Sequence, residues 1–287
     1  MGATVGEKLK QIKASLEAAG DESAALDAVL LLAGAENVSE NFARLHPEAS
    51  LKNEAVLDGY VARRLKREPV SKILHVKGFW KDDFYVDENV LDPRPDSETL
   101  IESVLKQFPD RRAALRILDL GTGSGCLVLT LLREYEKARG VGVDISGKAL
   151  AVACKNADLL GLSDRFAPVC ADWEPPDFAA RFDGAFDVVV ANPPYIDASE
   201  ELPPDTLFDP PQALFAAENG LKAYKDIAAR LSGLLAQDGE AFFECGHTQA
   251  RAVSEILTAR GFVLTGVDKD LAGVDRCVRA RKAKKES

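Results

Sequence analysis

The residues best suited to chemistry form the run Asn192-Pro193-Pro194-Tyr195, directly after an apolar stretch, residues 186–191, that is predicted to be a buried strand. Two consecutive prolines fix φ and remove two backbone N–H donors, so this corner exposes carbonyl oxygens without matching donors. A planar amide nitrogen carries two N–H bonds and is a poor nucleophile, so a catalyst must hold it in line and accept those hydrogens. The Asn192 side-chain oxygen and the Pro193 carbonyl can do both, while Tyr195 can lie against the flat substrate. We therefore predict that Asn192, Pro193 and Tyr195 are catalytic and that the whole corner, Pro194 included, binds substrate.

A glycine-rich turn follows an earlier predicted strand, residues 115–120, and precedes an apolar helical pattern. Glycines at such a turn let the backbone approach a ligand closely. A dinucleotide-binding fingerprint would need glycine or alanine where Cys126 stands, whereas the G-x-G-x-G form suits S-adenosylmethionine, which has no pyrophosphate. A tight structural turn is the alternative explanation. The predicted cofactor-binding residues of this loop are Gly121, Thr122, Gly123, Ser124 and Gly125.

Two further strand ends carry side chains suited to a nucleoside. Asp144 ends the next predicted strand, where an acidic residue usually accepts hydrogen bonds from a ribose diol. Its alternative role, capping the following helix, can be filled by Ser146. Trp173 follows the third strand and offers a flat ring to adenine, although a loop tryptophan is often simply packed. With Asn192 as a further contact, these residues predict S-adenosylmethionine as the cofactor and S-adenosylhomocysteine as the product.

The predicted reaction is a direct displacement at the sulfonium methyl group. Positive charge develops on the attacking nitrogen, so acceptor dipoles aimed at it stabilise the transition state more than the ground state. No general base is required at the outset. A proline-stiffened loop without chemistry is the alternative for the Pro-Pro pair taken alone.

The elements that position these residues fall into two regions that differ in the spacing of their apolar residues. Apolar residues recur at helical spacing up to Glu68, with Asp21 as a candidate N-cap of the second helix, and residues 73–76 and 84–86 predict a β-hairpin. Short strands then alternate with helical patterns, which indicates an α/β fold with a parallel, doubly wound sheet. The predicted strands are 115–120, 140–144, 166–170, 186–191 and 240–245. The predicted domains are a helical domain at 1–72, a hairpin linker at 73–92 and a catalytic domain at 93–287.

Composition limits the classes of partner and the location. The 287 residues carry a net charge of −10, which repels polyanions and counts against a nucleic-acid substrate. No apolar run approaches the ~20 residues of a membrane span, and no leader pattern is present, so we expect a cytoplasmic protein without a membrane partner, acting as a monomer. The five scattered cysteines argue against disulfides and a metal site. The basic run from Arg63 to Arg67 is either a solvated helix end or a partner-binding face.

Beyond these motifs the sequence resembles the HemK family of release-factor glutamine methyltransferases over nearly its whole length. The segment Pro93-Arg94-Pro95-Asp96-Ser97-Glu98 is similar to the family signature P-R-P-(D/E)-T-E, with Ser97 in place of threonine. Three later segments also resemble family motifs, namely 208–221, 244–249 and 270–276. Departures lie at Ala216-Ala217, at Asn219 and at Pro204-Asp205-Thr206, on the loop after the corner.

This resemblance implies a class I, Rossmann-like seven-stranded methyltransferase domain behind a helical domain that helps to dock a protein substrate. The implied substrate is the glutamine of the Gly-Gly-Gln motif in peptide chain release factors, whose methylation tunes translation termination. The same match implies that residues 121–125, Asp144, Trp173 and Asn192 contact the cofactor, and that Asn192 to Tyr195 hold the glutamine. Arg94 and Glu98 are further candidates near the site.

Three other functions fit parts of the pattern. A glutamine methyltransferase for a ribosomal protein would share every motif. An adenine amino-group methyltransferase on DNA or RNA would also suit the Asn192 corner, but it should carry a basic groove. A non-catalytic S-adenosylmethionine-binding protein would not need an intact corner, and a dehydrogenase would need a different glycine spacing.

Overall fold

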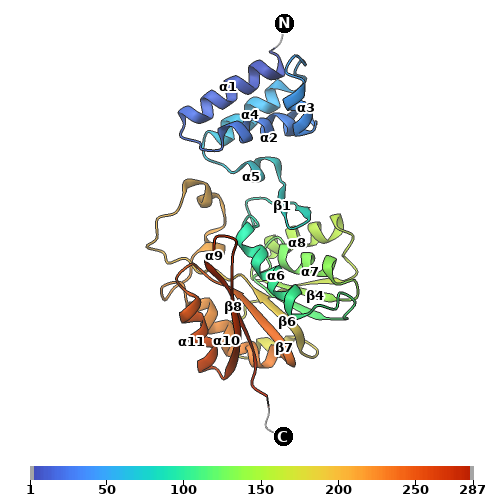
Figure 1. The fold of residues 1–287 in the computed structure, drawn as a ribbon, viewed down its shortest axis with the longest axis vertical. Helices are drawn as coiled ribbons and strands as arrows, with labels where there is room; N and C mark the ends of the chain where they lie inside the picture. Colours follow the sequence, from blue (N-terminus) through green and yellow to red (C-terminus); the bar gives the residue numbers. More distant parts are fainter. Residues whose placement is uncertain (1–2, 285–287) are drawn as a thin grey trace. The chain divides into compact units, whose positions relative to one another are not determined.

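The computed structural model describes residues 3–284, so the outermost residues of the predicted domains, 1–2 and 285–287, lie outside the described part. The chain forms two compact units (Figure 1). The first comprises Met1–Val76 and Leu202–Phe208, and the second comprises Lys77–Glu201 and Asp209–Ser287. The first unit therefore ends four residues after the predicted boundary at 72 and includes a segment from far along the chain.

The first unit is helical, as its periodicity predicts. Thr4 and Glu7 form a capping box at its start: the Glu7 N–H donates to Thr4 Oγ1 at 3.3 Å, and the Thr4 N–H donates to Glu7 Oε2 at 2.9 Å. Ile12 and Leu16, one turn apart on the same face of the first helix, are buried with Leu57 in one apolar core. The helices are α1 (Val5–Ala18), α2 (Ala24–Glu36), α3 (Glu40–Leu45), α4 (Glu54–Arg64) and α5 (Val70–Leu74), with the 3-10 helix η3 (Pro204–Phe208) in the distant segment.

The prediction that Asp21 caps α2 is wrong. The N-cap is Ser23, whose own side chain makes no capping hydrogen bond. Asp21 instead accepts a hydrogen bond from the Ser23 N–H at 2.9 Å and turns its other oxygen toward Arg64 at 2.8 Å. A carboxylate that a buried guanidinium attracts is thus held beside the helix start without capping it.

Arg64 is the centre of a buried cluster of charges within the first unit. Its side chain is 4% exposed and pairs with Asp21, with Asp27 Oδ2 at 2.7 Å and with Asp205 Oδ2 at 2.7 Å. Arg67 Nε reaches the other Asp205 oxygen at 2.9 Å. The interpretation of the basic run as a solvated helix end is therefore wrong for Arg64, because its side chain is buried. Its ion pairs connect η3 with α2 and α4.

The second unit is built on a mixed seven-stranded sheet in the order β5-β4-β3-β6-β7-β9-β8. All pairings from β5 to β7 are parallel, and only β9 runs against its neighbours. The five predicted strands are confirmed, although β7 begins five residues earlier than predicted. The reversed strand β9, which lies between β7 and the edge strand β8, was not predicted. The strands are β3 (Arg116–Leu120), β4 (Arg139–Asp144), β5 (Phe166–Cys170), β6 (Phe186–Ala191), β7 (Leu235–Glu244), β8 (Phe262–Lys269) and β9 (Asp275–Lys282).

Helices cover both faces of this sheet (Figure 1). Alternate strand residues point to opposite faces, so Ile117 and Val188 pack with one helical layer and Leu118 and Val189 with the other. The first layer consists of α6 (Glu98–Gln107), α7 (Cys126–Glu134) and α8 (Gly147–Leu159), and the second of α10 (Lys222–Leu234) and α11 (Ala250–Ala259). Shorter helices in the connections are η1 (Pro95–Ser97), η2 (Phe178–Arg181) and α9 (Pro211–Leu214).

The predicted hairpin is displaced along the chain. Residues 73–76 do not form a strand, because α5 includes Ile73 and ends at His75, which adopts the left-handed conformation with φ 56°. The hairpin consists of β1 (Lys77–Phe79) and β2 (Asp82–Phe84) and belongs to the second unit. The Glu98 carboxylate accepts a hydrogen bond from the Trp80 N–H at its turn, at 2.8 Å.

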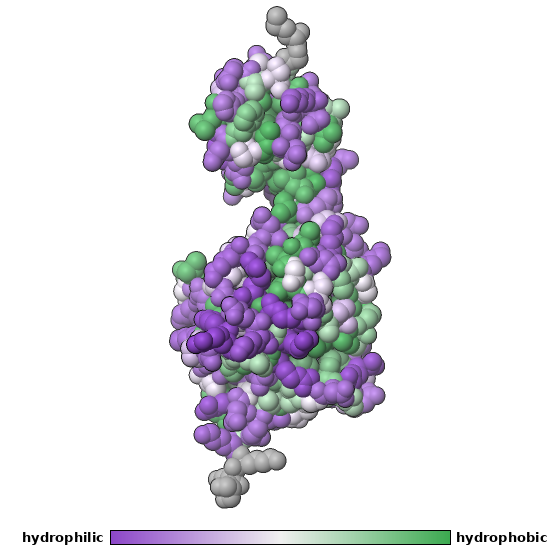
Figure 2. Space-filling view, turned by 90° about the vertical axis from the view of Figure 1, so that its right-hand side faces the viewer, coloured by the Kyte–Doolittle hydropathy of each residue, from purple (hydrophilic) through white to green (hydrophobic). Residues whose placement is uncertain are grey.

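The surface is mostly polar. On the face drawn in Figure 2, hydrophilic side chains cover much of the surface, with smaller hydrophobic areas between them. Among residues 3–284, no helix combines the length and the apolar character that a bilayer span requires.

Asp119 in β3 is a fully buried carboxyl group. Its Oδ2 accepts a hydrogen bond from Thr122 Oγ1 at 2.7 Å, and its Oδ1 has no partner among the described residues. Burial raises the pKa of Asp119 to about 7, against the opposing effect of the Thr122 hydrogen bond. Because the folded state holds this proton more tightly than the unfolded chain, Asp119 lowers stability as the pH rises from about 4 to about 7.

We predict that Arg64→Ala lowers the free energy of unfolding by about 3–5 kcal/mol, because three carboxylates lose their buried partner. Urea denaturation followed by circular dichroism measures the loss. The matched control is Lys66→Ala on the exposed side of the same turn, where a change below about 0.5 kcal/mol is expected. Equal midpoints for the two variants would contradict the role of the cluster.

We also predict that Asp119→Asn gains stability relative to the wild type as the pH is raised from 5 to 8, by on the order of 2 kcal/mol. The asparagine does not titrate, whereas the buried carboxyl group must ionise in this range. Unfolding free energies at several pH values give the difference. The exposed variant Asp183→Asn should follow the wild-type curve, and parallel curves for Asp119→Asn and the wild type would refute the prediction.

Candidate active site

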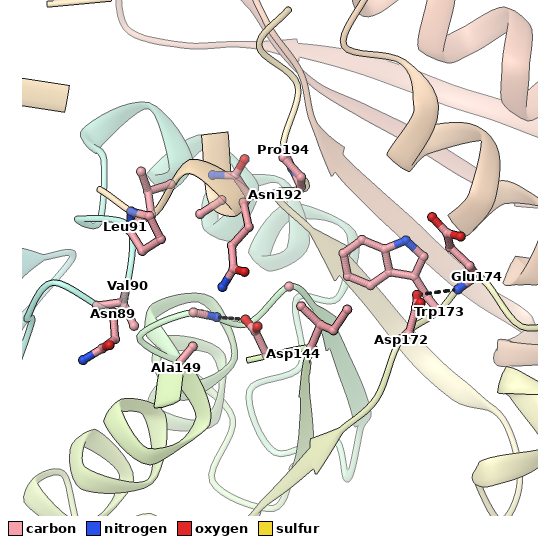
Figure 3. A pocket seen from close by; sticks show the side chains of 16 residues that line it. Asn89, Val90, Leu91, Asp144, Ala149, Asp172, Trp173, Glu174, Asn192 and Pro194 are labelled. Atoms are coloured by element: carbon pink, nitrogen blue, oxygen red, sulfur yellow. Dashed lines mark hydrogen bonds between the residues drawn. The ribbon is translucent and has the colours of Figure 1, made fainter. Parts of the chain in front are cut away.

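A cavity of about 300 Å³ lies at the carboxyl ends of the central strands (Figure 3). The sheet reverses its winding here, because β3 pairs with β4 on one side and with β6 on the other. Ligands of open α/β sheets bind at such a switch point. The lining residues come from the ends of β3, β4, β5 and β6 and the loops that follow them, from the start of α8, and from the segments 89–91 and 210–213. They are Asn89, Val90, Leu91, Gly121, Gly123, Asp144, Ile145, Ala149, Asp172, Trp173, Glu174, Asn192, Pro194, Pro210, Gln212 and Ala213.

The glycine loop contributes two of its five predicted residues to the cavity wall, Gly121 and Gly123. Both have positive φ, 78° and 53°, a conformation that favours glycine. A Cβ on Gly123 would meet no atom within 4 Å, whereas one on Gly121 would contact the Trp173 ring at 3.7 Å. The backbone at Gly123 therefore borders open space that a ligand can fill, while the Gly121 and Thr122 N–H groups donate to the Val143 carbonyl.

The other three loop residues shape the loop and do not line the cavity. Thr122 and Ser124 are buried, and Thr122 binds Asp119 as described. The Ser124 carbonyl accepts a hydrogen bond from Asn156 Nδ2 at 2.8 Å. Gly125 is the N-cap of α7 with φ 82°, and a Cβ there would lie 2.9 Å from a Leu129 methyl group.

Asp144 and Trp173 stand on the cavity wall, as predicted (Figure 3). Asp144 Oδ2 accepts a hydrogen bond from the Gly123 N–H at 3.0 Å, and Oδ1 accepts one from the Ser146 N–H at 2.9 Å. Burial raises the pKa of Asp144, and these backbone donors oppose the effect. Ser146 itself caps α8 by accepting from the Ala149 N–H, so the carboxylate is not required as the cap. Each Asp144 oxygen keeps a lone pair for a ligand hydroxyl.

The proline corner is divided between the cavity and its support. Asn192 and Pro194 line the cavity, whereas Pro193 is buried and does not. Asn192 Nδ2 donates to Ser97 Oγ at 3.1 Å, and within residues 3–284 its carbonyl oxygen has no hydrogen-bond partner. The cavity thus joins an acidic hydrogen-bond acceptor, a flat ring, open glycine backbone and an amide oxygen, an arrangement that fits a nucleoside carrying a reactive chain.

Tyr195 is held behind the corner by residues that the motif alone did not indicate. Its hydroxyl donates to Glu244 Oε1 at 3.4 Å, and burial raises its pKa. Its carbonyl accepts from Gln249 Nε2 at 2.9 Å, and a Cβ on Gly220 would lie 2.0 Å from the same oxygen. Gly220, Glu244 and Gln249 lie in the segments 208–221 and 244–249, which resemble family motifs. That resemblance was the one indication of their importance, because residue spacing alone did not point to them.

The remaining family-signature residues have supporting positions. Arg94 Nη2 pairs with Asp209 Oδ2 at 2.6 Å, and Glu98 holds the hairpin turn. Sequence reasoning missed the walls made by residues 89–91 and 210–213, because these loops lack periodicity and approach the strand ends only in the folded chain.

Comparison with known proteins agrees with this geometry. Residues 111–247 match the model of a methyltransferase domain, and residues 7–74 match that of the PrmC N-terminal domain. The chain is 40% identical to a release factor glutamine methyltransferase of Rhodospirillum rubrum over 93% of this chain and 82% of the relative. It is 39% identical to one of Caulobacter vibrioides over 96% and 95% of the two chains.

Solved structures agree at the level of the fold. A methyltransferase from Pyrococcus furiosus superposes with a TM-score of 0.55 at 14% identity, covering 79% of this chain and all of the other. The mixed sheet, the glycine loop and the relatives together confirm the class I fold, its cofactor S-adenosylmethionine and the resemblance to HemK proteins. The chain belongs to the family of release factor glutamine methyltransferases.

Proposed function

We propose that this enzyme transfers a methyl group from S-adenosylmethionine to the side-chain nitrogen of the glutamine in the Gly-Gly-Gln motif of peptide chain release factors, and so tunes translation termination. One observation carries the proposal: Asn192 lines the cavity together with Gly121, Asp144 and Trp173, and its Nδ2 is bound to Ser97, which does not line it. The relatives named above carry the same activity in their names. The enzyme acts in the cytoplasm as a monomer, with no nucleic acid or membrane as partner.

The residues of the cavity wall divide between cofactor and substrate. Gly121 and Gly123 admit the cofactor close to the backbone, and Asp144 accepts hydrogen bonds from the ribose diol. Trp173 packs against the adenine ring. Thr122, Ser124 and Gly125 serve the cofactor indirectly, by holding the loop in shape. Bound S-adenosylmethionine supplies an electrophilic methyl group on a sulfonium sulfur.

The corner orients the nucleophile. Asn192 Oδ1 and the Pro193 carbonyl accept the two N–H bonds of the glutamine amide, which fixes the nitrogen in line for attack. Their negative ends stabilise the positive charge that develops on the nitrogen. Pro194 keeps the turn rigid, and Tyr195 packs on the amide plane and excludes water.

Two other substrates remain as outcomes of the test. A ribosomal-protein glutamine would use the same corner without change. The adenine amino group is disfavoured by the net charge of −10, and within residues 3–284 the guanidinium of Arg64 in the basic run is consumed by the buried cluster.

The primary test is mass spectrometry of a release factor incubated with this enzyme and labelled S-adenosylmethionine. We expect one methyl group on the Gly-Gly-Gln glutamine. Asn192→Ala should lower the rate by roughly 100-fold or more, because one oriented acceptor is lost, and should still bind the cofactor. Ribosomal protein and nucleic acid are supplied in parallel, and label confined to either would replace the proposed substrate.

A second prediction concerns the cofactor. Asp144→Asn should weaken the binding of S-adenosylmethionine by roughly 10- to 100-fold, because a charge-assisted hydrogen bond to the ribose is worth about 1.5–3 kcal/mol. Isothermal titration calorimetry measures the dissociation constant. The exposed Asp183→Asn variant has the same change of charge and should bind like the wild type. An unchanged affinity in Asp144→Asn would remove this residue from the ribose site.

A further inference from the structure

Two polar side chains that do not line the cavity, Ser97 and Glu244, lie behind the Asn192 side chain of the cavity wall. Ser97 lies at the junction of η1 and α6, Glu244 ends β7, and Asn192 follows β6. Ser97 and Glu244 are almost fully buried, at 2% and 1% exposure. The Ser97 side chain is near enough to the Glu244 carboxyl group to lower its pKa, and the buried Glu244 Oε2 has no hydrogen-bond partner among the described residues.

The chemistry of a hydroxyl group gives this chain of contacts a direction. Ser97 Oγ accepts a hydrogen from Asn192 Nδ2 at 3.1 Å, so its single hydrogen remains available for donation. An ionised carboxylate only accepts hydrogen bonds, so the unpartnered Glu244 Oε2 is the nearby acceptor toward which we infer that this hydrogen turns. The order of donation is therefore from the Asn192 amide to the Ser97 hydroxyl and from that hydroxyl to Glu244.

This direction matters because the two ends of an asparagine amide are nearly identical in shape and opposite in function. Asn192 lines the cavity and its NH₂ end is bound to Ser97, so the carbonyl oxygen is the end that remains to accept hydrogen bonds from a substrate. A flipped amide would present two N–H donors to a substrate nitrogen that also carries donors, and the pair would repel.

We propose that Ser97 and Glu244 are positioning residues that hold the Asn192 amide with its oxygen toward the substrate. The proposal rests on the proposed function, since it explains how the acceptor for the glutamine amide is oriented. Neither Ser97 nor Glu244 is among the residues that line the cavity, so neither is placed to touch the substrate or the cofactor. The proposal gives a function to Glu244, whose buried carboxylate costs stability when it is charged.

The surroundings of Glu244 make the orientation sensitive to pH. Burial raises the pKa of Glu244 to about 7, while Ser97 and Arg276 oppose the rise. The titratable groups that face it are Tyr195, Tyr224, Asp96, Arg276, Cys126 and Cys245. Burial raises the pKa values of both tyrosines and both cysteines further above neutrality. Below about pH 7 Glu244 gains a hydrogen, can donate to Ser97 and no longer enforces the direction.

The test measures kcat, KM and cofactor affinity in the full-length enzyme. Ser97→Ala should lower kcat roughly tenfold, with the KM for the release factor and the affinity for S-adenosylmethionine unchanged, because only the amide orientation is lost. Ser97→Thr restores the hydroxyl group and should recover most of that loss. The matched control is Ser103→Ala, a buried serine of the same helix that donates to Asp268 at 2.9 Å away from the cavity, and it should keep the wild-type kcat.

The pH profile tests Glu244 separately. The wild-type kcat should fall as the pH drops below about 7, and Glu244→Gln, which does not titrate, should lose this inflection. Wild-type kcat in Ser97→Ala, a loss of the same size in Ser103→Ala, or an inflection that persists in Glu244→Gln would overturn the proposal.

A substrate-free measurement separates this proposal from the proposed function. The ¹H–¹⁵N resonances of the Asn192 side-chain amide, assigned by their absence in Asn192→Ala, should shift with pH near 7 in the wild type and stay fixed in Glu244→Gln. An inactive wild type would refute the proposed function alone. Amide resonances that do not respond to Glu244 would refute the positioning role alone.

Discussion

The parallel pairing of β3 with β4 on one side and β6 on the other is the constraint on which the site depends. Parallel strands bring their carboxyl ends to one edge, and the change of winding direction at β3 separates the loops there enough to leave a cavity. The glycine loop and the proline corner directly follow β3 and β6, and Asp144 is the last residue of β4. A shift in either pairing would move a cofactor residue away from the acceptor corner. The register of these two strand pairs therefore sets the distance between the cofactor residues and the corner.

The same edge concentrates buried carboxyl groups. Asp119 and Glu244 are both inaccessible to solvent, and burial raises the pKa of each to about 7. Such groups cost stability when ionised. Each lies one contact behind a residue that shapes the site, Asp119 behind the glycine loop and Glu244 behind Tyr195 and the Ser97 hydroxyl. Buried ionisable groups that lower stability but fix the orientation of neighbouring side chains are typical of functional sites.

The loop that follows the corner is constrained by electrostatics from another part of the chain. Leu202–Phe208 leaves the second unit after Glu201, joins the helical unit and returns at Asp209. Asp205 secures it by ion pairs to Arg64 and Arg67. This segment departs from the family pattern at Pro204-Asp205-Thr206, yet the aspartate still supplies the carboxylate that the buried guanidinium requires. The segment 202–208 is therefore held in the first unit by the charge cluster around Arg64.

The sequence by itself determined the cofactor class, the strand ends and the acceptor corner, because glycine spacing, paired prolines and short apolar runs are local signals. It also placed Asp144 and Trp173 at strand ends, since parallel strands must end at a common edge, and the structure shows both on the cavity wall. Only the tertiary structure decided that Gly121 and Gly123 line the cavity while their loop neighbours support it. It alone joined Ser97 to Asn192 across 95 residues and Arg64 to Asp205 across 141. Contacts of that range leave no periodicity in a sequence, because they depend on how separate elements pack rather than on the spacing within any one of them.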